Sequence, residues 1–199
     1  MAQSNNQSPK QARVLRAKKQ KILIFPKIGS AINVVVLLLC FLPFVGIYNT
    51  DMPGIEIQVN GWNALFCGLS GNYTATGAVY GNMDIFNYYA EEACHGLGLW
   101  GMIAMLVLVA ALAVTLAAAI GKQPVLCVCA FVLNLAGFVL LILAYRSGMA
   151  VAQSNIIEVY CQNNPACSVE SYATIPAVLM LVCTVLHGIA AVKALKLKK

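Results

Sequence analysis

Four long apolar runs constrain this chain more than any other feature of its sequence. No Asp, Glu, Lys or Arg interrupts them, and they cover Ile28–Tyr48, Leu97–Ile120, Pro124–Tyr145 and Thr174–Val192. About 20 apolar residues in a helix cross a bilayer core of about 30 Å, and hydrocarbon offers backbone amides no partner outside the helix. The runs lack the alternation typical of barrel strands. The sequence therefore predicts an all-α transmembrane fold, a four-helix bundle.

The charged residues are sorted between the intervals that separate these runs. Twelve of the thirteen basic residues lie before the first run, between the second and third, or after the fourth, and Arg146 is the exception. The seven acidic residues all lie in the other two intervals. Lys and Arg favour the cytoplasmic side during insertion. We therefore expect both termini in the cytoplasm, and the loops 49–96 and 146–173 on the outer side.

This sorting divides the chain into three regions. Residues 1–27 form a cytoplasmic basic segment, residues 28–192 the four-helix transmembrane domain with its outer loops, and residues 193–199 a cytoplasmic basic tail. The first run is longer than the apolar part of a signal peptide, so we interpret it as a retained helix. We expect the protein in the plasma or cytoplasmic membrane.

The basic segment 1–27 has two interpretations. Its Lys and Arg side chains orient the chain and attract anionic lipid, each contributing on the order of 1 kcal/mol near such a surface. The alternative is a docking arm for an acidic partner or for nucleic acid. We favour the first, so the expected contacts are the lipid bilayer and anionic lipid, and not nucleic acid.

Aromatic residues give an independent indication of the outer interface. In this topology, one aromatic residue flanks each run at its outer end, where amphipathic rings are favoured. These residues are Tyr48, Trp100, Tyr145 and Tyr172.

Four of the eight cysteines lie in the outer loops, where disulfides persist. They are Cys67, Cys94, Cys161 and Cys167. Four cysteines allow three pairings. The simplest pairs Cys67 with Cys94 and Cys161 with Cys167, and pairing between the loops stays open.

The first outer loop carries a strand pattern. Ile55, Ile57 and Val59 alternate with polar residues, and Asn60-Gly61, a strong type I′ turn signal, follows. Apolar and other residues alternate again after the turn, which predicts a β-hairpin over 55–66. We expect this hairpin and the rest of the loop to form a small extracytoplasmic cap. Asn72 begins an Asn-Tyr-Thr triplet and is a possible glycosylation site.

A thiol-disulfide oxidoreductase is the enzymatic alternative. Cys94 precedes His95, and a histidine can activate a neighbouring thiol. Membrane oxidases of the disulfide-forming and vitamin K epoxide reductase-like classes use a C-x-x-C pair, which this chain lacks. Cys94 or Cys67 would have to serve instead. We therefore favour a non-enzymatic role with no catalytic residue, no metal site and no cofactor.

Three side chains with an amide or an imidazole group lie inside the apolar runs, at Asn33, Asn134 and His187. Because burying polar groups in a membrane is costly, such residues are functional candidates. A proton relay needs several ionisable groups in series, and His187 is the only one in the runs. We therefore favour interhelical hydrogen bonding, and the similar depths of Asn33 and His187 would allow a bond between those two side chains.

The overall plan resembles that of claudin-like and MARVEL-type proteins, which have four helices, internal termini and cysteines in the outer loops. The strand pattern of the first loop is more similar to the claudin-like group. The claudin signature places G-L-W before two cysteines, whereas Gly98-Leu99-Trp100 follows Cys94, so the resemblance does not imply a tight-junction role. The stretch 60–68 also resembles a motif of uncharacterised small bacterial tetraspan membrane proteins.

These observations favour a structural, adaptor or accessory subunit that acts through helix packing and disulfide-tied outer loops. Small residues on the helices suit close packing within the bundle or against another membrane protein. We therefore expect a membrane-protein partner or a homo-oligomer. A small transporter or channel subunit is the third alternative, and the scarcity of charge in the runs disfavours it.

Overall fold

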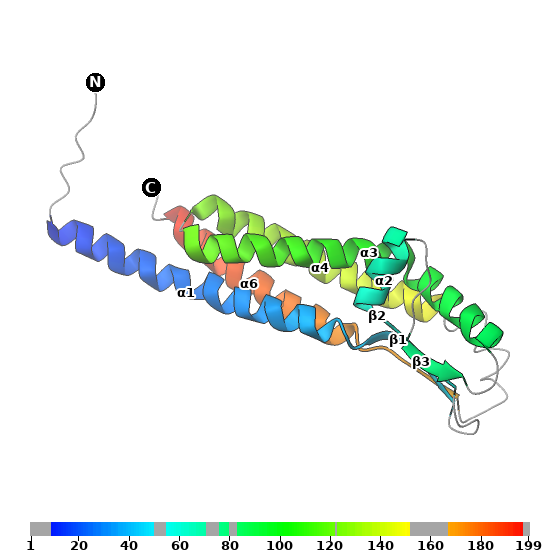
Figure 1. Ribbon diagram of the computed structural model, residues 1–199. Coiled ribbons are helices and arrows are strands. Elements are labelled where there is room, and N and C mark those ends of the chain that lie inside the picture. Colours follow the sequence, from blue (N-terminus) through cyan, green and yellow to red (C-terminus); the bar gives the residue numbers. More distant parts are fainter. Residues whose placement is uncertain are drawn as a thin grey trace.

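The computed structural model describes residues 9–49, 55–70, 76–79, 83–121, 123–151 and 167–196. Within these ranges, four helices are long and apolar enough to cross a membrane. They are α1 (Pro9–Leu39), α3 (Met83–Gly121), α4 (Pro124–Val151) and α6 (Thr174–Lys196). The helices lie side by side in one bundle (Figure 1). This confirms the predicted four-helix architecture of an integral membrane protein.

Three of the four spans lie where the apolar runs predict them. Their apolar windows are Leu99–Gly121, Pro124–Ser147 and Thr174–Lys196. The helices themselves extend further at the loops: α3 already begins at Met83, and α4 continues to Val151. The predicted outer loops 49–96 and 146–173 are therefore partly helical.

The first span differs from the prediction at both ends. Its window is Ile22–Leu39, and the chain enters strand β1 (Pro43–Asn49) where the sequence predicted helix up to Tyr48. Proline has no backbone N–H to donate and disfavours helical geometry in the residue before it. Pro43 therefore ends the helix although the apolar run continues. At the other end the span gains Lys27, whose side chain is exposed.

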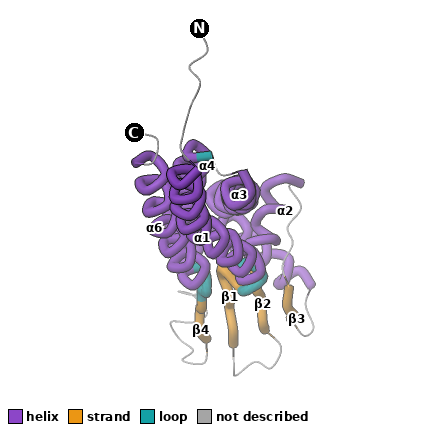
Figure 2. The backbone as a smooth tube through the Cα atoms, turned by 90° about the vertical axis from the view of Figure 1, so that its left-hand side faces the viewer, coloured by secondary structure: helices purple, strands orange, loops and turns teal. Residues whose placement is uncertain are grey.

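The segments that follow α1 and precede α6 contribute to one small sheet. Among the described residues it has the order β3-β2-β1-β4, with β2 at Ile55–Asn60, β3 at Thr76–Val79 and β4 at Cys167–Glu170. All neighbouring strands are antiparallel. Figure 2 shows the four strands together at one end of the bundle, away from both chain termini. Since β1 follows α1 and β4 precedes α6, the pairing of β1 with the edge strand β4 continues the pairing of those two helices.

The predicted hairpin over 55–66 is only half correct. Ile55–Asn60 is a strand, but Gly61–Ser70 forms a helix, α2, in place of the second strand. The side-chain Oδ1 of Asn60 accepts a hydrogen bond from the backbone N–H of Asn63 at 2.8 Å. This is the geometry of a helix N-cap, which asparagine favours as strongly as it favours tight turns. The partners of β2 are instead β1 and β3.

We call the sheet and α2 together the cap. One hydrophobic cluster runs through the cap and the bundle without a break. From the cap it includes Phe44 of β1, Val59 of β2, and Ala64 and Leu65 of α2, all buried. From the bundle it includes Met105 and neighbouring side chains of all four long helices. The cap is therefore packed as part of the bundle.

The end of α1 is joined directly to the beginning of α2. The N–H groups of Phe41 and Leu42 donate to Leu38 and Leu39, so neither reaches the carbonyl of Leu37. That carbonyl accepts a hydrogen bond from the indole Nε1 of Trp62 at 3.2 Å.

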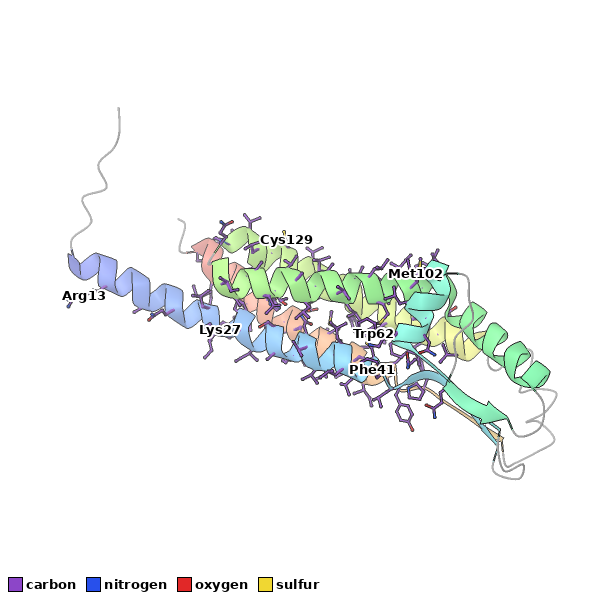
Figure 3. All side chains as sticks on the ribbon, viewed as in Figure 1. Arg13, Lys27, Phe41, Trp62, Met102 and Cys129 are labelled. Atoms are coloured by element: carbon purple, nitrogen blue, oxygen red, sulfur yellow. The ribbon has the colours of Figure 1, made fainter. Side chains whose placement is uncertain are left out.

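The next free carbonyl of this helix end is satisfied in the same way. The backbone N–H of Gly61 donates to the carbonyl of Cys40 at 2.9 Å. The rings of Phe41 and Trp62 also contact each other, with centroids 5.6 Å apart (Figure 3). The start of α2 thus caps the C-terminus of α1.

Replacing Trp62 tests this cap. Trp62→Phe keeps an aromatic ring but removes the donor to the Leu37 carbonyl, and an unsatisfied buried carbonyl costs about 1–3 kcal/mol. We expect a lower thermal midpoint in lipid nanodiscs. Phe41→Leu is the matched control, because it alters the ring contact and keeps the indole donor. An equal effect of the two variants would contradict the capping role of the indole.

Candidate functional site

Buried polar side chains occur on all four spanning helices. We call five of them the polar set, and each is at most 5% exposed. The polar set consists of Asn33 on α1, Thr115 on α3, Asn134 on α4, and Thr184 and His187 on α6. Since the surrounding core is apolar, these residues are the strongest candidates for a site inside the bundle.

The polar set lies within a narrow depth of the bundle. Gly137 marks a common height for three helices, because a Cβ atom there would meet Met180 of α6 at 2.6 Å and Leu108 of α3 at 3.2 Å. At 1.5 Å per residue, Asn134 lies ~4.5 Å from this height and His187 lies ~10 Å from it, both toward the chain termini. The whole set therefore fits within about one to two helical turns.

Asn33 connects α1 to α3. Its side-chain Nδ2 donates to Oγ1 of Thr115 at 3.2 Å, and the Thr115 hydroxyl donates to the carbonyl of Leu112 at 2.9 Å. Both side chains are buried. This is an interhelical hydrogen bond of the predicted kind, but its partner is Thr115 and not His187.

His187 lies where α1 and α6 approach closely. Its Nδ1 is 2.8 Å from the carbonyl of Cys183, one turn earlier on the same helix. The imidazole ring lies against Gly29 of α1, where a side chain on residue 29 would overlap it. The thiol of Cys183 donates to the carbonyl of Gly29 at 3.5 Å. The hydrogen bond considered between Asn33 and His187 is not formed, since neither Oδ1 of Asn33 nor Nε2 of His187 has a hydrogen-bond partner.

Asn134 and Thr184 bond within their own helices. Nδ2 of Asn134 donates to the carbonyl of Ala130 at 2.6 Å, and the hydroxyl of Thr184 donates to that of Met180 at 2.9 Å. Each of these bonds uses one donor of the side chain and links no second helix. Neither of these printed bonds therefore connects two helices.

Three polar atoms of this set have no hydrogen-bond partner. They are Oδ1 of Asn33, Oδ1 of Asn134 and Nε2 of His187. A buried polar atom without a partner is costly, so each requires a physical explanation. The described residues contain no group of three His, Cys, Asp or Glu side chains that could hold a metal ion.

The predicted disulfide cysteines are only partly placed. Cys67 lies on α2, Cys94 lies on α3 and Cys167 begins β4, but their side chains lie outside the described part of the structure. Cys161 and the triplet residue Asn72 also lie outside the described residues. The disulfide pairings and the glycosylation site therefore stay predictions. Of the four cysteines in the apolar runs, Cys40, Cys127 and Cys183 are buried free thiols, whereas Cys129 is an exposed one.

The four predicted interface aromatics fall into different environments. Trp100 lies at the start of the α3 span and Tyr172 lies just before α6, both at the end of the bundle that carries the cap. Their side chains are 43% and 37% exposed, respectively. Tyr145 is half-buried and packs against the hydrophobic cluster. Tyr48 lies in β1, and its side chain is not described.

Sequence reasoning missed Thr115, Thr184 and Gly29. The two threonines sit in apolar runs, where a hydroxyl bonded to its own helix attracts no notice. A signal for Thr115 was present in its spacing: it lies four residues after Ala111 and three before Ala118, and all three are buried on one face of α3. Nothing in the sequence marks Gly29, because its role depends on a ring contributed by α6.

Comparisons with known proteins found no match to this chain. No protein-family model matches the chain, and no curated protein or solved structure matches it. The functional argument therefore rests on the residues and on their arrangement.

Gly29 provides a direct test of the α1–α6 contact. Gly29→Ala places a methyl group where the His187 imidazole lies, and such overpacking costs about 1–3 kcal/mol. We expect a lower thermal midpoint, partly restored by adding His187→Ala. The matched control is Gly188→Ala, whose Cβ would lie 3.3 Å from the ring of Phe131 and should cost less. A Gly29→Ala protein as stable as wild type would contradict the contact.

Proposed function

We propose that the protein is a non-catalytic integral membrane protein that acts as a structural, adaptor or accessory subunit. The carrying observation is that the cap and the bundle share one hydrophobic cluster. Phe44 and Val59 of the sheet are fully buried in it. A cap packed in this way presents a fixed surface at one end of the spans, which suits binding to another protein better than it suits a moving gate.

The outward surface of the bundle supports the same proposal. Exposed valines recur every seven residues on α4 and on α6. They are Val125, Val132 and Val139 on α4, and Val178, Val185 and Val192 on α6. A seven-residue period keeps side chains on one face of a helix. These faces suit lipid or an apolar partner helix, in line with a membrane-protein partner or a homo-oligomer.

The chemistry of the bundle interior favours a non-catalytic role. Among the described residues, His187 is the only buried side chain of the Asp, Glu, Lys, Arg and His types. Its Nδ1 bonds a backbone carbonyl, so it lacks the oriented nucleophile or second acid that general acid–base chemistry requires. The strand-bearing first loop is the feature on which the resemblance to claudin-like proteins rests.

The proposed orientation places the cap outside and both termini in the cytoplasm. The part of α1 before its span, residues 9–21, continues as a helix beyond the other helices (Figure 1) and contains six basic residues. At the same end, Nζ of Lys193 lies 4.7 Å from the ring centroid of Phe25. A basic helix at this position favours the cytoplasmic side and contacts with anionic lipid.

Neutralising this helix tests the orientation. Changing the six basic residues of 9–21 to Gln removes most of the charge that directs insertion, so we expect a fraction of molecules with a C-terminal tag outside the cell. Protease access to the tag in intact cells measures that fraction. The matched control changes the acidic residues Glu91 and Glu92 to Gln, which contribute little to orientation. A wild-type tag that is cleaved from outside would contradict the proposal.

Site-specific photo-crosslinking tests the function itself. We would introduce a photoreactive amino acid at Leu69 of the cap, which is 62% exposed, at Val132 on the bundle face, and at Ile120 near the opposite end. A subunit with a defined partner should give a discrete protein adduct at Leu69 or Val132, and only lipid adducts at Ile120. Identification of the adduct, and its loss in cells lacking the identified partner, would complete the test.

The enzymatic alternative predicts a different result. A thiol-disulfide oxidoreductase should accumulate a mixed disulfide when Cys67 or Cys94 is changed to Ser, because the remaining thiol cannot resolve it. Such trapping, together with no discrete adduct at the cap or bundle positions, would contradict the proposed role.

A further inference from the structure

Three aromatic residues lie at one level near the cap end of the bundle. The contact at Gly137 fixes a common height for α3, α4 and α6. Trp100, Tyr145 and Tyr172 each lie eight residues from the contact residue of their own helix, in the direction of the cap. At 1.5 Å per residue this is about 12 Å. We call this height the aromatic level, and amphipathic rings favour the edge of the hydrocarbon core.

A lysine marks the opposite edge of the apolar spans. Lys193 is exposed and is the first Lys, Arg, Asp or Glu of α6. It lies thirteen residues after Met180, the contact residue of α6, which is about 20 Å toward the chain termini. The aromatic level and Lys193 are therefore about 32 Å apart, close to the thickness of a bilayer core of about 30 Å. The aromatic level thus corresponds to the edge of the core at the cap end.

Helix α1 ends before it reaches the aromatic level. Nδ2 of Asn33 donates to Oγ1 of Thr115, so these residues of α1 and α3 lie at one height. From there Leu39, the last residue of α1, lies ~9 Å toward the cap, whereas Trp100 lies ~22 Å toward the cap on α3. Measured against α3, α1 therefore ends ~13 Å short of the aromatic level.

A contact with α6 gives a second estimate of the same gap. Gly29 of α1 lies at the height of the His187 imidazole. Leu39 lies ~15 Å from Gly29 toward the cap, and Tyr172 lies ~22 Å from His187 in the same direction. Measured against α6, α1 ends ~7 Å short of the aromatic level. Both contacts therefore leave α1 too short to reach the edge of the core.

The start of α2 occupies the depth that α1 leaves. A Cβ atom on Gly61 would meet Sδ of Met105 at 2.8 Å, and Met105 lies ~7 Å from Trp100 toward the chain termini. The indole of Trp62 donates to the carbonyl of Leu37, next to the end of α1. Gly61 and Trp62 therefore lie on the membrane side of the aromatic level.

The surface at this depth is apolar and exposed. Leu38 and Phe41 are each 61% exposed, and the ring of Trp62 contacts that of Phe41 (Figure 3). We call these three residues the cap-base patch. The patch continues the exposed surface of Val34 and Val35, which belong to the spanning part of α1. It is therefore continuous with the lipid-facing surface of the bundle.

We propose that the base of the cap is immersed in the bilayer leaflet at the cap end, and that the cap-base patch binds the acyl chains of that leaflet. The turn after α1 and the start of α2 then complete the crossing that α1 leaves unfinished. Non-helical backbone at this depth requires donors from the protein. Trp62 and Gly61 supply them to the carbonyls of Leu37 and Cys40. The proposal holds for either orientation of the chain, so it does not rest on the proposed function.

Quenching of tryptophan fluorescence by brominated lipids tests this depth. The chain has two tryptophans, Trp62 and Trp100. Trp100→Phe leaves Trp62 as the single tryptophan and keeps its indole donor. The full-length variant and the wild-type protein are reconstituted in phosphatidylcholine liposomes whose acyl chains carry bromine either near the glycerol or near the bilayer centre. The emission of Trp100 is the difference between the two proteins.

We expect the ratio of quenching by deep bromine to quenching by shallow bromine to be higher for Trp62 than for Trp100. An equal or lower ratio would place Trp62 at or above the aromatic level and would overturn the proposal. Stronger quenching of Trp62 by aqueous iodide than by either lipid would place the patch in water, with the same consequence. Quenching of Trp62 by none of these agents would mean that protein covers the patch, which also overturns it.

A charge placed at the two depths provides the second measurement. Leu99 is the matched control for Phe41, because it is also 61% exposed but lies at the aromatic level beside Trp100. Each position is changed to Ala and to Asp, so that the step from Ala to Asp isolates the charge. A charge costs more in the core than at its edge, so we expect this step to lower the thermal midpoint in lipid nanodiscs more at Phe41. Equal steps at the two positions would overturn the proposal.

Discussion

The structure depends on the rule that a backbone carbonyl inside a membrane must find a donor within the protein. Helix α1 ends at Leu39, before the apolar run of the sequence does, so its last carbonyls lack donors from a continuing helix. The indole of Trp62 and the backbone N–H of Gly61 supply two of them. This requirement fixes the start of α2 against the end of α1, and the position of the cap follows from it.

Packing extends this local connection to the whole cap. A Cβ atom on Gly61 would lie 2.8 Å from Sδ of Met105 and 2.9 Å from Cζ of Phe44, so α2, α3 and β1 meet at that glycine without space for a side chain. The backbone N–H of Tyr172 donates to the carbonyl of Pro43 at 2.9 Å, which ties the start of α6 to the start of β1. Segments from both long connections between the spans are thus held at the same end of the bundle.

The spans could be predicted from the sequence because hydropathy and length suffice to recognise them. The end of the first span could not, since Pro43 and not hydropathy decides it. Asn60-Gly61 fits a tight turn and a helix N-cap equally well, and the choice depended on whether Trp62 met a free carbonyl. Burial of Asn33, Asn134 and His187 could be anticipated from their position, but their partners could not, because helical back-bonding to Ala130 and Cys183 competes with bonds between helices.

The polar set and the small residues divide the task of fixing the helices. Gly29, Gly137 and Gly188 each face a side chain of another helix and so set how closely two helices approach. The polar residues set rotation, because turning α1 or α6 about its axis would carry Asn33 or His187 toward lipid, where its polar atoms would be still more costly. Bonds within one helix contribute little to association, yet a side chain that must stay buried still excludes most rotations. Keeping these side chains buried therefore disfavours the misaligned packings that would expose them to lipid.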